Sequence, residues 1–197
     1  MIPRDITREE LAALAIRRYE GEVNLVATNV ELERALEEIR GETVVGLDTE
    51  TRPAFRKGES YLPCLVQVAT ARRVHVFQLA RLDFSAAATQ VIGNPAIVKA
   101  GIGLKYDLGQ LKRLFPFDAA AVVDLGELAK RSGFTQSGVR NLAGAFLRFR
   151  VPKGAQTSNW SAPRLSEQQI RYAATDAWVC RELYFELQDW GMLEPHR

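Results

Sequence analysis

The first residues of the chain follow a helical hydrophobic pattern. In residues 6–19 (ITREELAALAIRRY), apolar side chains recur at the three- and four-residue intervals of an amphipathic helix. Thr7 and Glu10 stand at its start with the spacing of a capping box. We therefore expect a helical extension within residues 1–21, packed on a single domain formed by residues 22–197.

Beyond this extension, runs of β-branched residues alternate with helical patterns. Short apolar runs predict strands at residues 22–28, 43–48, 65–70, 73–78, 96–101 and 121–124. Helical spacing predicts helices at residues 30–40, 83–92, 104–115, 125–131, 138–149 and 167–190. Asn29 and Ser166 are the expected N-caps of the first and last of these helices. This order indicates an α/β domain with a mixed sheet covered by helices.

Two carboxylates follow a segment with the composition of a buried strand. Asp48 and Glu50 come directly after the residues VVGL. Alternate side chains of an extended segment point to the same face, so these two carboxylates repel each other. Divalent cations remove such repulsion, and Mg²⁺ and Mn²⁺ prefer oxygen ligands. The alternative is that both residues are solvated at a strand end.

A second motif lies in the predicted C-terminal helix. Tyr172 and Asp176 are one helical turn apart and therefore share a face. Most of their neighbours are Ala, Ile and Val, so an aspartate at this place needs a partner. If that partner is not a metal ion, it is solvent or the guanidinium group of Arg171 or Arg181.

A third candidate follows the strand predicted at residues 96–101. Asp107 lies in the first turn of the next predicted helix, after two glycines that allow close backbone approach. The alternative is that Asp107 only stabilises the helix dipole. Asp118 and Asp124 compete for the same role, although Asp124 opens a helix and is more simply an N-cap.

The order of these three motifs resembles the DEDD superfamily of 3′-5′ exonucleases, tyrosine subclass, with ribonuclease D and the Werner-syndrome exonuclease domain as similar members. The similar stretches are VVGLDTET (44–51), CLVQVAT (64–70), VKAGIGLKYDLGQL (98–111) and SNWSAPRLSEQQIRYAATDAWVCRELY (158–184). The resemblance spans about residues 23–190. It implies a ribonuclease-H-like fold, which is a five-stranded mixed sheet with helices on both faces.

The resemblance also implies hydrolysis at the 3′ end of DNA or RNA with two divalent ions. Asp48, Glu50 and Asp176 are expected to hold one Mg²⁺ or Mn²⁺ ion, and Asp48 also to bridge to the second. Asp107 is expected to complete the second ion's shell through water. Tyr172 is expected to orient the attacking water, and Glu50 to contact the terminal 3′-OH.

Two polar loops, at residues 52–63 and 150–165, are expected to contact the nucleic-acid strand. The expected phosphate contacts are Arg56, Lys57, Lys105 and Lys153, with Arg52, Arg150 and Arg164 as further candidates. Scattered solvated charge is the alternative explanation of these cations. Phe55 and Tyr61 are candidates for stacking on a base, whereas Trp160 is expected to anchor its loop.

Composition adds little to this picture. The formal net charge of +2 neither requires nor excludes a nucleic-acid partner. Cys64 and Cys180 do not form a disulfide framework, so we expect buried free thiols and a cytoplasmic protein. No apolar run is long enough to span a membrane. His75 and His196 lie outside the motifs, and we assign no metal role to either.

Two other functions remain open on the sequence. One is a nucleic-acid-binding module without catalysis, against which the presence of all four carboxylates argues. The other is a phosphodiesterase of the same fold that acts on short oligonucleotides or dinucleotides. The sequence ends without the helical domains that full ribonuclease D carries, so transfer-RNA processing is not expected.

Overall fold

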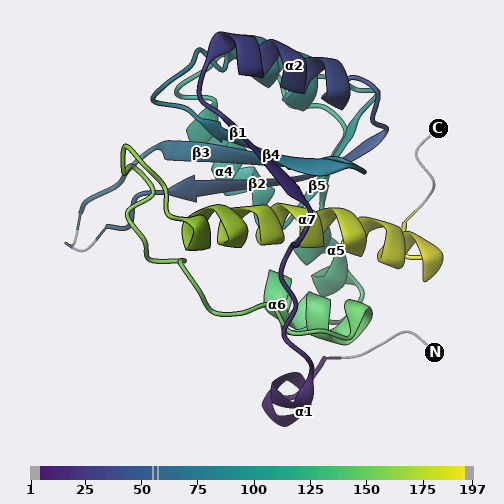
Figure 1. Ribbon diagram of the computed structural model, residues 1–197. Helices are drawn as coiled ribbons and strands as arrows, with labels where there is room; N and C mark the ends of the chain where they lie inside the picture. Colours follow the sequence, from purple (N-terminus) through teal and green to yellow (C-terminus); the bar gives the residue numbers. More distant parts are fainter. Residues whose placement is uncertain (1–4, 55, 57, 194–197) are drawn as a thin grey trace.

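The computed structural model describes residues 5–54, 56 and 58–193, which form an α/β fold (Figure 1). The described residues contain a six-stranded sheet in the order β1-β4-β3-β2-β5-β6. Its strands are β1 (Glu22–Val26), β2 (Val44–Thr51), β3 (Pro63–Ala69), β4 (Arg73–Gln78), β5 (Val98–Gly101) and β6 (Val122–Asp124). β3 is antiparallel to both of its neighbours and the other pairs are parallel, so the predicted mixed sheet is confirmed.

The strand count implied by the family resemblance is wrong by one, because β1 adds an edge strand. β1 pairs in parallel with β4, from Glu22 opposite Arg73 to Val26 opposite Phe77. Val26 is completely buried, which fixes the strand on the sheet. The local pattern of residues 22–28 predicts this strand correctly.

Helices cover both faces of the sheet, as expected. The α-helices of the described chain are α1 (Arg8–Ala13), α2 (Asn29–Ile39), α3 (Ser85–Ala87), α4 (Leu104–Leu111), α5 (Leu125–Arg131), α6 (Val139–Leu142) and α7 (Glu167–Asp189). Figure 1 shows α2 and α7 on opposite sides of the sheet. One apolar cluster joins α2 and α4 to the sheet, and two others contain the buried side of α7. No described helix is long and apolar enough to cross a membrane.

The predicted helix at residues 6–19 is wrong in its second half. The Thr7–Glu10 capping box forms, but α1 ends at Ala13. The following residues are extended because they bond to distant parts of the chain. The N–H of Arg150 donates to the Ala15 carbonyl at 2.8 Å, and the N–H of Tyr19 donates to Thr175 Oγ1 at 3.0 Å. Tertiary hydrogen bonds therefore replace those of the expected helix.

Three further predictions change in detail. Thr28, not Asn29, caps α2 through its side chain, whereas Ser166 caps α7 as expected. The helices predicted at residues 83–92 and 138–149 each change to a π-helical segment, Ala88–Ile92 and Ala143–Leu147 respectively. No candidate site residue lies in either segment.

Gly46 controls how closely α7 lies on the sheet. A Cβ atom at this position of β2 would stand 2.0 Å from the Ala177 carbonyl oxygen and 2.8 Å from the Arg181 nitrogen, both in the α7 backbone. Any side chain at position 46 would therefore separate the helix from the strand. Two carboxylates lie next to this contact. Asp48 follows Gly46 by two positions in β2, and Asp176 directly precedes Ala177 in α7.

We expect Gly46→Ala to lower the free energy of unfolding by about 3 kcal/mol or more, because the new methyl group meets backbone that cannot move aside. Gly109→Ala in α4 is the matched control, since a Cβ there meets nothing within 4 Å. It should leave stability unchanged or raise it by up to about 1 kcal/mol. Urea unfolding followed by circular dichroism measures both, and a Gly46→Ala protein as stable as the control would contradict the close contact.

Candidate active site

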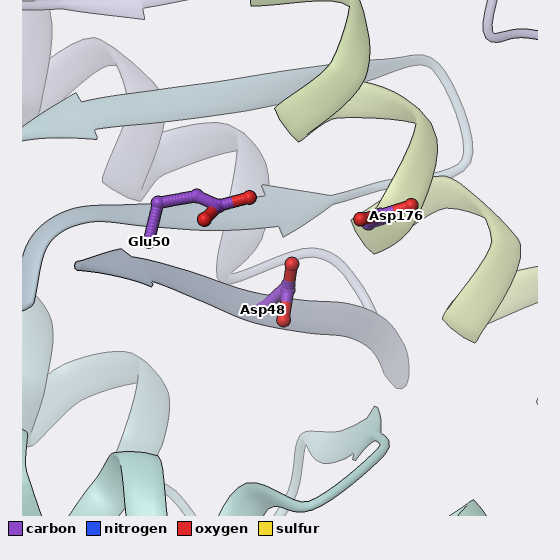
Figure 2. Close-up of side chains that lie close together, drawn as sticks. All are labelled: Asp48, Glu50 and Asp176. Carbon is purple, nitrogen blue, oxygen red and sulfur yellow. The ribbon is translucent and has the colours of Figure 1, made fainter. Parts of the chain in front are cut away.

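Three carboxylates from two elements meet in one place (Figure 2). Asp48 and Glu50 extend from the same face of β2, and Asp176 faces them from α7. Each offers one oxygen, and these three oxygens all lie within 4.8 Å of one another. Residues more than a hundred positions apart are therefore brought together by the close contact between α7 and β2.

Burial and mutual repulsion raise the pKa of the two strand carboxylates. Burial raises the pKa of Asp48 well above its usual value, and the charges of Asp176 and Asp107 raise it further. For Glu50, burial first and the charge of Asp48 second raise the pKa to about 10. The protein alone therefore disfavours the ionised form of both groups.

Asp176 is buried, and one of its oxygens lacks a partner. Its side chain is 8% exposed, and Oδ1 has no hydrogen-bond partner within the described chain. Burial raises its pKa to about 6, against the opposing effects of the Tyr172 hydroxyl and the Arg140 guanidinium. An acceptor buried in this way needs a cation or a donor.

Neither arginine proposed as an alternative partner of Asp176 pairs with it. Arg171 donates to the carbonyl oxygens of Tyr19 and Gly21, at 3.2 and 3.1 Å. Arg181 donates to the Val44 carbonyl at 3.3 Å and lies 3.5 Å from Glu42. Both guanidinium groups are therefore engaged elsewhere, and Oδ1 of Asp176 has no partner among the described residues.

Asp107 lies beside the three-carboxylate cluster and not within it. It is half-buried in the first turn of α4, and burial raises its pKa to about 6 while the Thr49 hydroxyl opposes the rise. The charge of Asp107 raises the pKa of both Asp48 and Glu50, so Asp107 is close enough to influence the cluster electrostatically.

The two competitors of Asp107 have other roles. Asp124 caps α5 as predicted, accepting from the N–H groups of Gly126 and Glu127 at 3.0 and 3.1 Å. Asp118 is almost fully exposed and pairs with Lys112 at 2.8 Å. Asp107 is thus the candidate that remains for the fourth carboxylate.

The donor set fits a divalent cation. Hard ions such as Mg²⁺ take carboxylate oxygens, and three of these converge here with an unpartnered buried oxygen among them. A bound cation would supply positive charge that stabilises the ionised forms of Asp48 and Glu50, which the protein alone disfavours. Asp48, Glu50 and Asp176 are the residues able to hold it.

Tyr172 lies one turn before Asp176 and is held by its neighbours. Its ring lies 5.9 Å from that of Trp160, measured between centroids, and Gly154 leaves room for it. Burial first, and the charge of Asp176 second, raise the pKa of the Tyr172 hydroxyl above its ordinary value. Trp160 is 1% exposed, which agrees with its expected role in anchoring the loop.

Two residues near the site escape the sequence analysis. Arg140 of α6 lowers the pKa of Asp176 from a distant part of the chain. Gln67 of β3 pairs with Asp48 in register, is completely buried, and has no described hydrogen-bond partner at either amide atom. A polar residue at an inward position of the stretch CLVQVAT was the available signal for Gln67, whereas no sequence signal indicates Arg140.

The expected contacts with the nucleic-acid strand lie on several elements: α4, the loop after β2 and the loop before α7. Lys105 is exposed on α4, and its charge acts on Glu127 of α5. Arg56 is exposed in its loop, while Lys57 and Phe55 lie outside the described residues. Arg52 stacks over the ring of Tyr61 at 4.9 Å. Among the expected phosphate contacts, Lys153 borders the same hollow as Tyr172.

The cysteines are free, as expected, although only Cys180 is buried. Cys64 is half-buried, and its thiol donates to the Glu50 carbonyl at 3.2 Å. Cys64 therefore contacts the backbone of a site residue. Its sulfur is not part of the carboxylate cluster.

Comparison with known proteins agrees with this geometry. A family model described as 3′-5′ exonuclease matches residues 23–190. Ribonuclease D from Gluconacetobacter diazotrophicus is 34% identical over 164 residues, which is 81% of this chain and 41% of that protein. The chain spans between about a quarter and about half of the length of the first curated relatives that it matches.

Solved structures share the fold. The Aedes aegypti Nibbler EXO domain superposes with a TM-score of 0.79 at 21% identity, covering 88% of this chain and 91% of that one. Brucella melitensis NrnC bound to pGG superposes with a TM-score of 0.67 at 21% identity, covering 91% and 85% respectively. At these identities the likeness concerns the fold.

The raised carboxylate pKa values determine how metal-free stability depends on pH. A carboxyl group whose pKa is higher in the folded state stabilises the fold most at low pH, where it is protonated in both states. That contribution is lost as the pH rises, first through the value of about 6 for Asp107 and Asp176, then towards about 10 for Glu50.

We therefore expect Asp48→Asn to raise the free energy of unfolding in EDTA at pH 8 by on the order of 1–3 kcal/mol, because it removes a carboxyl group whose ionisation the buried cluster opposes. At pH 4 the gain should shrink, since the carboxyl groups are protonated. Mn²⁺ should stabilise the unmodified protein and not the variant. Thermal unfolding at both pH values measures this, with Asp118→Asn as control; a variant less stable than the unmodified protein at pH 8 would exclude the repulsion.

Proposed function

The chain belongs to the 3′-5′ exonuclease family, and we propose that it removes nucleotides from the 3′ end of a nucleic acid by metal-dependent hydrolysis. The observation that carries this proposal is the convergence of Asp48, Glu50 and Asp176, with a buried oxygen of Asp176 left without a partner. Such a cluster is unstable in a protein without cations and suited to one that binds them.

The proposed roles rest on the cluster and on the charge of Asp107 near it. Asp48, Glu50 and Asp176 would hold one divalent ion, Mg²⁺ or Mn²⁺, and Asp107, whose charge acts on Asp48, would serve a second. Such ions, when bound, lower the pKa of water and stabilise charge on the phosphate oxygens. Glu50 lies near the C-terminal end of β2 and would contact the terminal 3′-OH.

Tyr172 acts as a hydrogen-bond donor in this proposal and not as a base. Its raised pKa keeps the hydroxyl protonated at neutral pH. Its ring is confined between Trp160 and Gly154, so the hydroxyl is held in one position beside Asp176. A fixed donor at this position orients the attacking water or a phosphate oxygen.

A second candidate is a nuclease for very short oligonucleotides. Brucella melitensis NrnC, solved with pGG, is matched over 85% of its length, whereas only 41% of the ribonuclease D relative is matched. Rates on substrates of two to twelve nucleotides separate the candidates, because a dinucleotide enzyme loses activity as length increases and a processive exonuclease does not. A module that only binds nucleic acid would hydrolyse none of them.

We expect Asp48→Ala and Asp176→Ala each to reduce kcat by about a thousandfold or more, since several kcal/mol of charge stabilisation are lost with the metal site. The assay follows 5′-labelled DNA and RNA oligonucleotides with Mg²⁺, Mn²⁺ or EDTA. Stepwise ladders from the 3′ end support the proposal. Asp118→Asn is the matched control and should retain full activity; full activity in Asp48→Ala or Asp176→Ala would refute the assignment.

Tyr172→Phe tests the tyrosine separately from the metal site. The rate should fall about ten- to a hundredfold because the attacking group loses its orientation. Mn²⁺ binding, measured by titration calorimetry, should stay within about twofold of the unmodified protein, since no ligand is changed. Undiminished turnover would remove the proposed role, and lost Mn²⁺ binding would show that the ring supports the ligands instead.

A further inference from the structure

A basic hollow adjoins Tyr172 on the side of α7 that faces the N-terminal segment. It has a volume of about 370 Å³ and lies between residue 18, the loop at residues 151–154 and the first turns of α7. Three cations line it, Arg18, Lys153 and Arg171, against one carboxylate, Glu167.

A second hollow continues the first. Its volume is about 450 Å³, and it shares Pro152 and Lys153 with its neighbour. It adds Arg140 and Arg150, so that five cations border the two hollows together. We call this the basic surface; it consists of Arg18, Arg140, Arg150, Lys153 and Arg171.

No cation of the basic surface has a carboxylate partner among the described residues. The ion pairs of the described chain involve Arg73, His75, Lys112, Lys130 and Arg181, which lie elsewhere. Arg140 and Arg171 bond only to backbone carbonyl groups, and Nε of Arg150 is buried without a partner. Their charges are therefore not neutralised by ion pairs among the described residues, although that of Arg140 acts on Asp176.

The position of this charge relates it to the reaction site. Tyr172 belongs both to the candidate active site and to the lining of the first hollow. Tyr172 is close enough to the carboxylate cluster for the charges of Asp176 and Glu50 to raise its pKa. A strand whose scissile phosphate lies at Tyr172 can therefore continue into the adjoining basic surface.

We propose that the basic surface binds the phosphodiester backbone of the substrate on the 5′ side of the scissile bond, two or more nucleotides from the 3′ end. The inference rests on the proposed exonuclease function and specifies where that substrate lies. Unneutralised cations beside an anionic catalytic cluster attract successive phosphates and hold the strand in register. A longer strand contacts more of these cations than a dinucleotide does.

The test compares Arg18→Ala/Lys153→Ala with the matched pair Arg34→Ala/Arg72→Ala. All four side chains are exposed, and Arg34 lies on α2, across the sheet from α7. With Mn²⁺, the first pair should raise KM for an eight-nucleotide single strand about tenfold and leave KM for a dinucleotide and kcat within about twofold. The control pair should change none of these values.

Binding provides a readout that does not depend on hydrolysis. Fluorescence anisotropy of a labelled eight-nucleotide strand in EDTA gives Kd over a range of salt concentrations. For the first pair, the slope of log Kd against log salt should fall by about 1.4, the value for two lost phosphate contacts on a single strand. Glu167→Gln should tighten binding by about two- to threefold, because it removes the carboxylate of the hollow.

Three outcomes would overturn the inference: no change in KM or slope for the first pair, an equal rise in KM for the dinucleotide, or the same effects from the control pair. A protein that hydrolyses no oligonucleotide would refute the proposed function instead. In that case the anisotropy result alone decides whether the basic surface binds a strand.

Discussion

The site depends on one contact, the approach of the α7 backbone to β2 at Gly46. The absence of a side chain there allows the helix to lie directly on the strand, with the Ala177 carbonyl above it. Asp176 precedes Ala177 and Asp48 follows Gly46 by two residues, so the same contact sets the distance between the carboxylates. Arg181 reinforces it by donating to the Val44 carbonyl at the start of β2.

This arrangement places repelling groups in a buried position, and the fold tolerates them because cations can compensate. The elevated pKa values of Asp48 and Glu50 express the repulsion, and the unpartnered oxygen of Asp176 shows that the protein itself does not resolve it. The neighbouring basic surface is positively charged, and its side chains form no ion pair among the described residues. Anionic and cationic regions on either side of Tyr172 suit a substrate that bridges metal ions and a phosphate backbone.

The N-terminal segment at residues 14–20 contributes to the basic surface. Hydrogen bonds between Ala15, Arg17 and the backbone of Arg150 tie the segment to the loop that precedes α7. The segment thereby brings Arg18 next to Lys153 and closes one side of the basic hollow. A helix over the whole of residues 6–19 would have made none of these bonds, so the departure from the local pattern shapes the surface.

Local features of the sequence determined much of this protein. Capping residues such as Thr7 and Ser166, and the periodicity of the strands, act over a few positions and are visible in the sequence. The motifs around Asp48 and Asp176 were recognisable because their spacing reflects strand and helix geometry. Tertiary structure alone decided which cations share a surface, where Arg140 and Gln67 lie, and that residues 14–20 are extended. Such features depend on contacts between segments that are far apart in the sequence. The energies of these contacts cannot be inferred from a local pattern of residues.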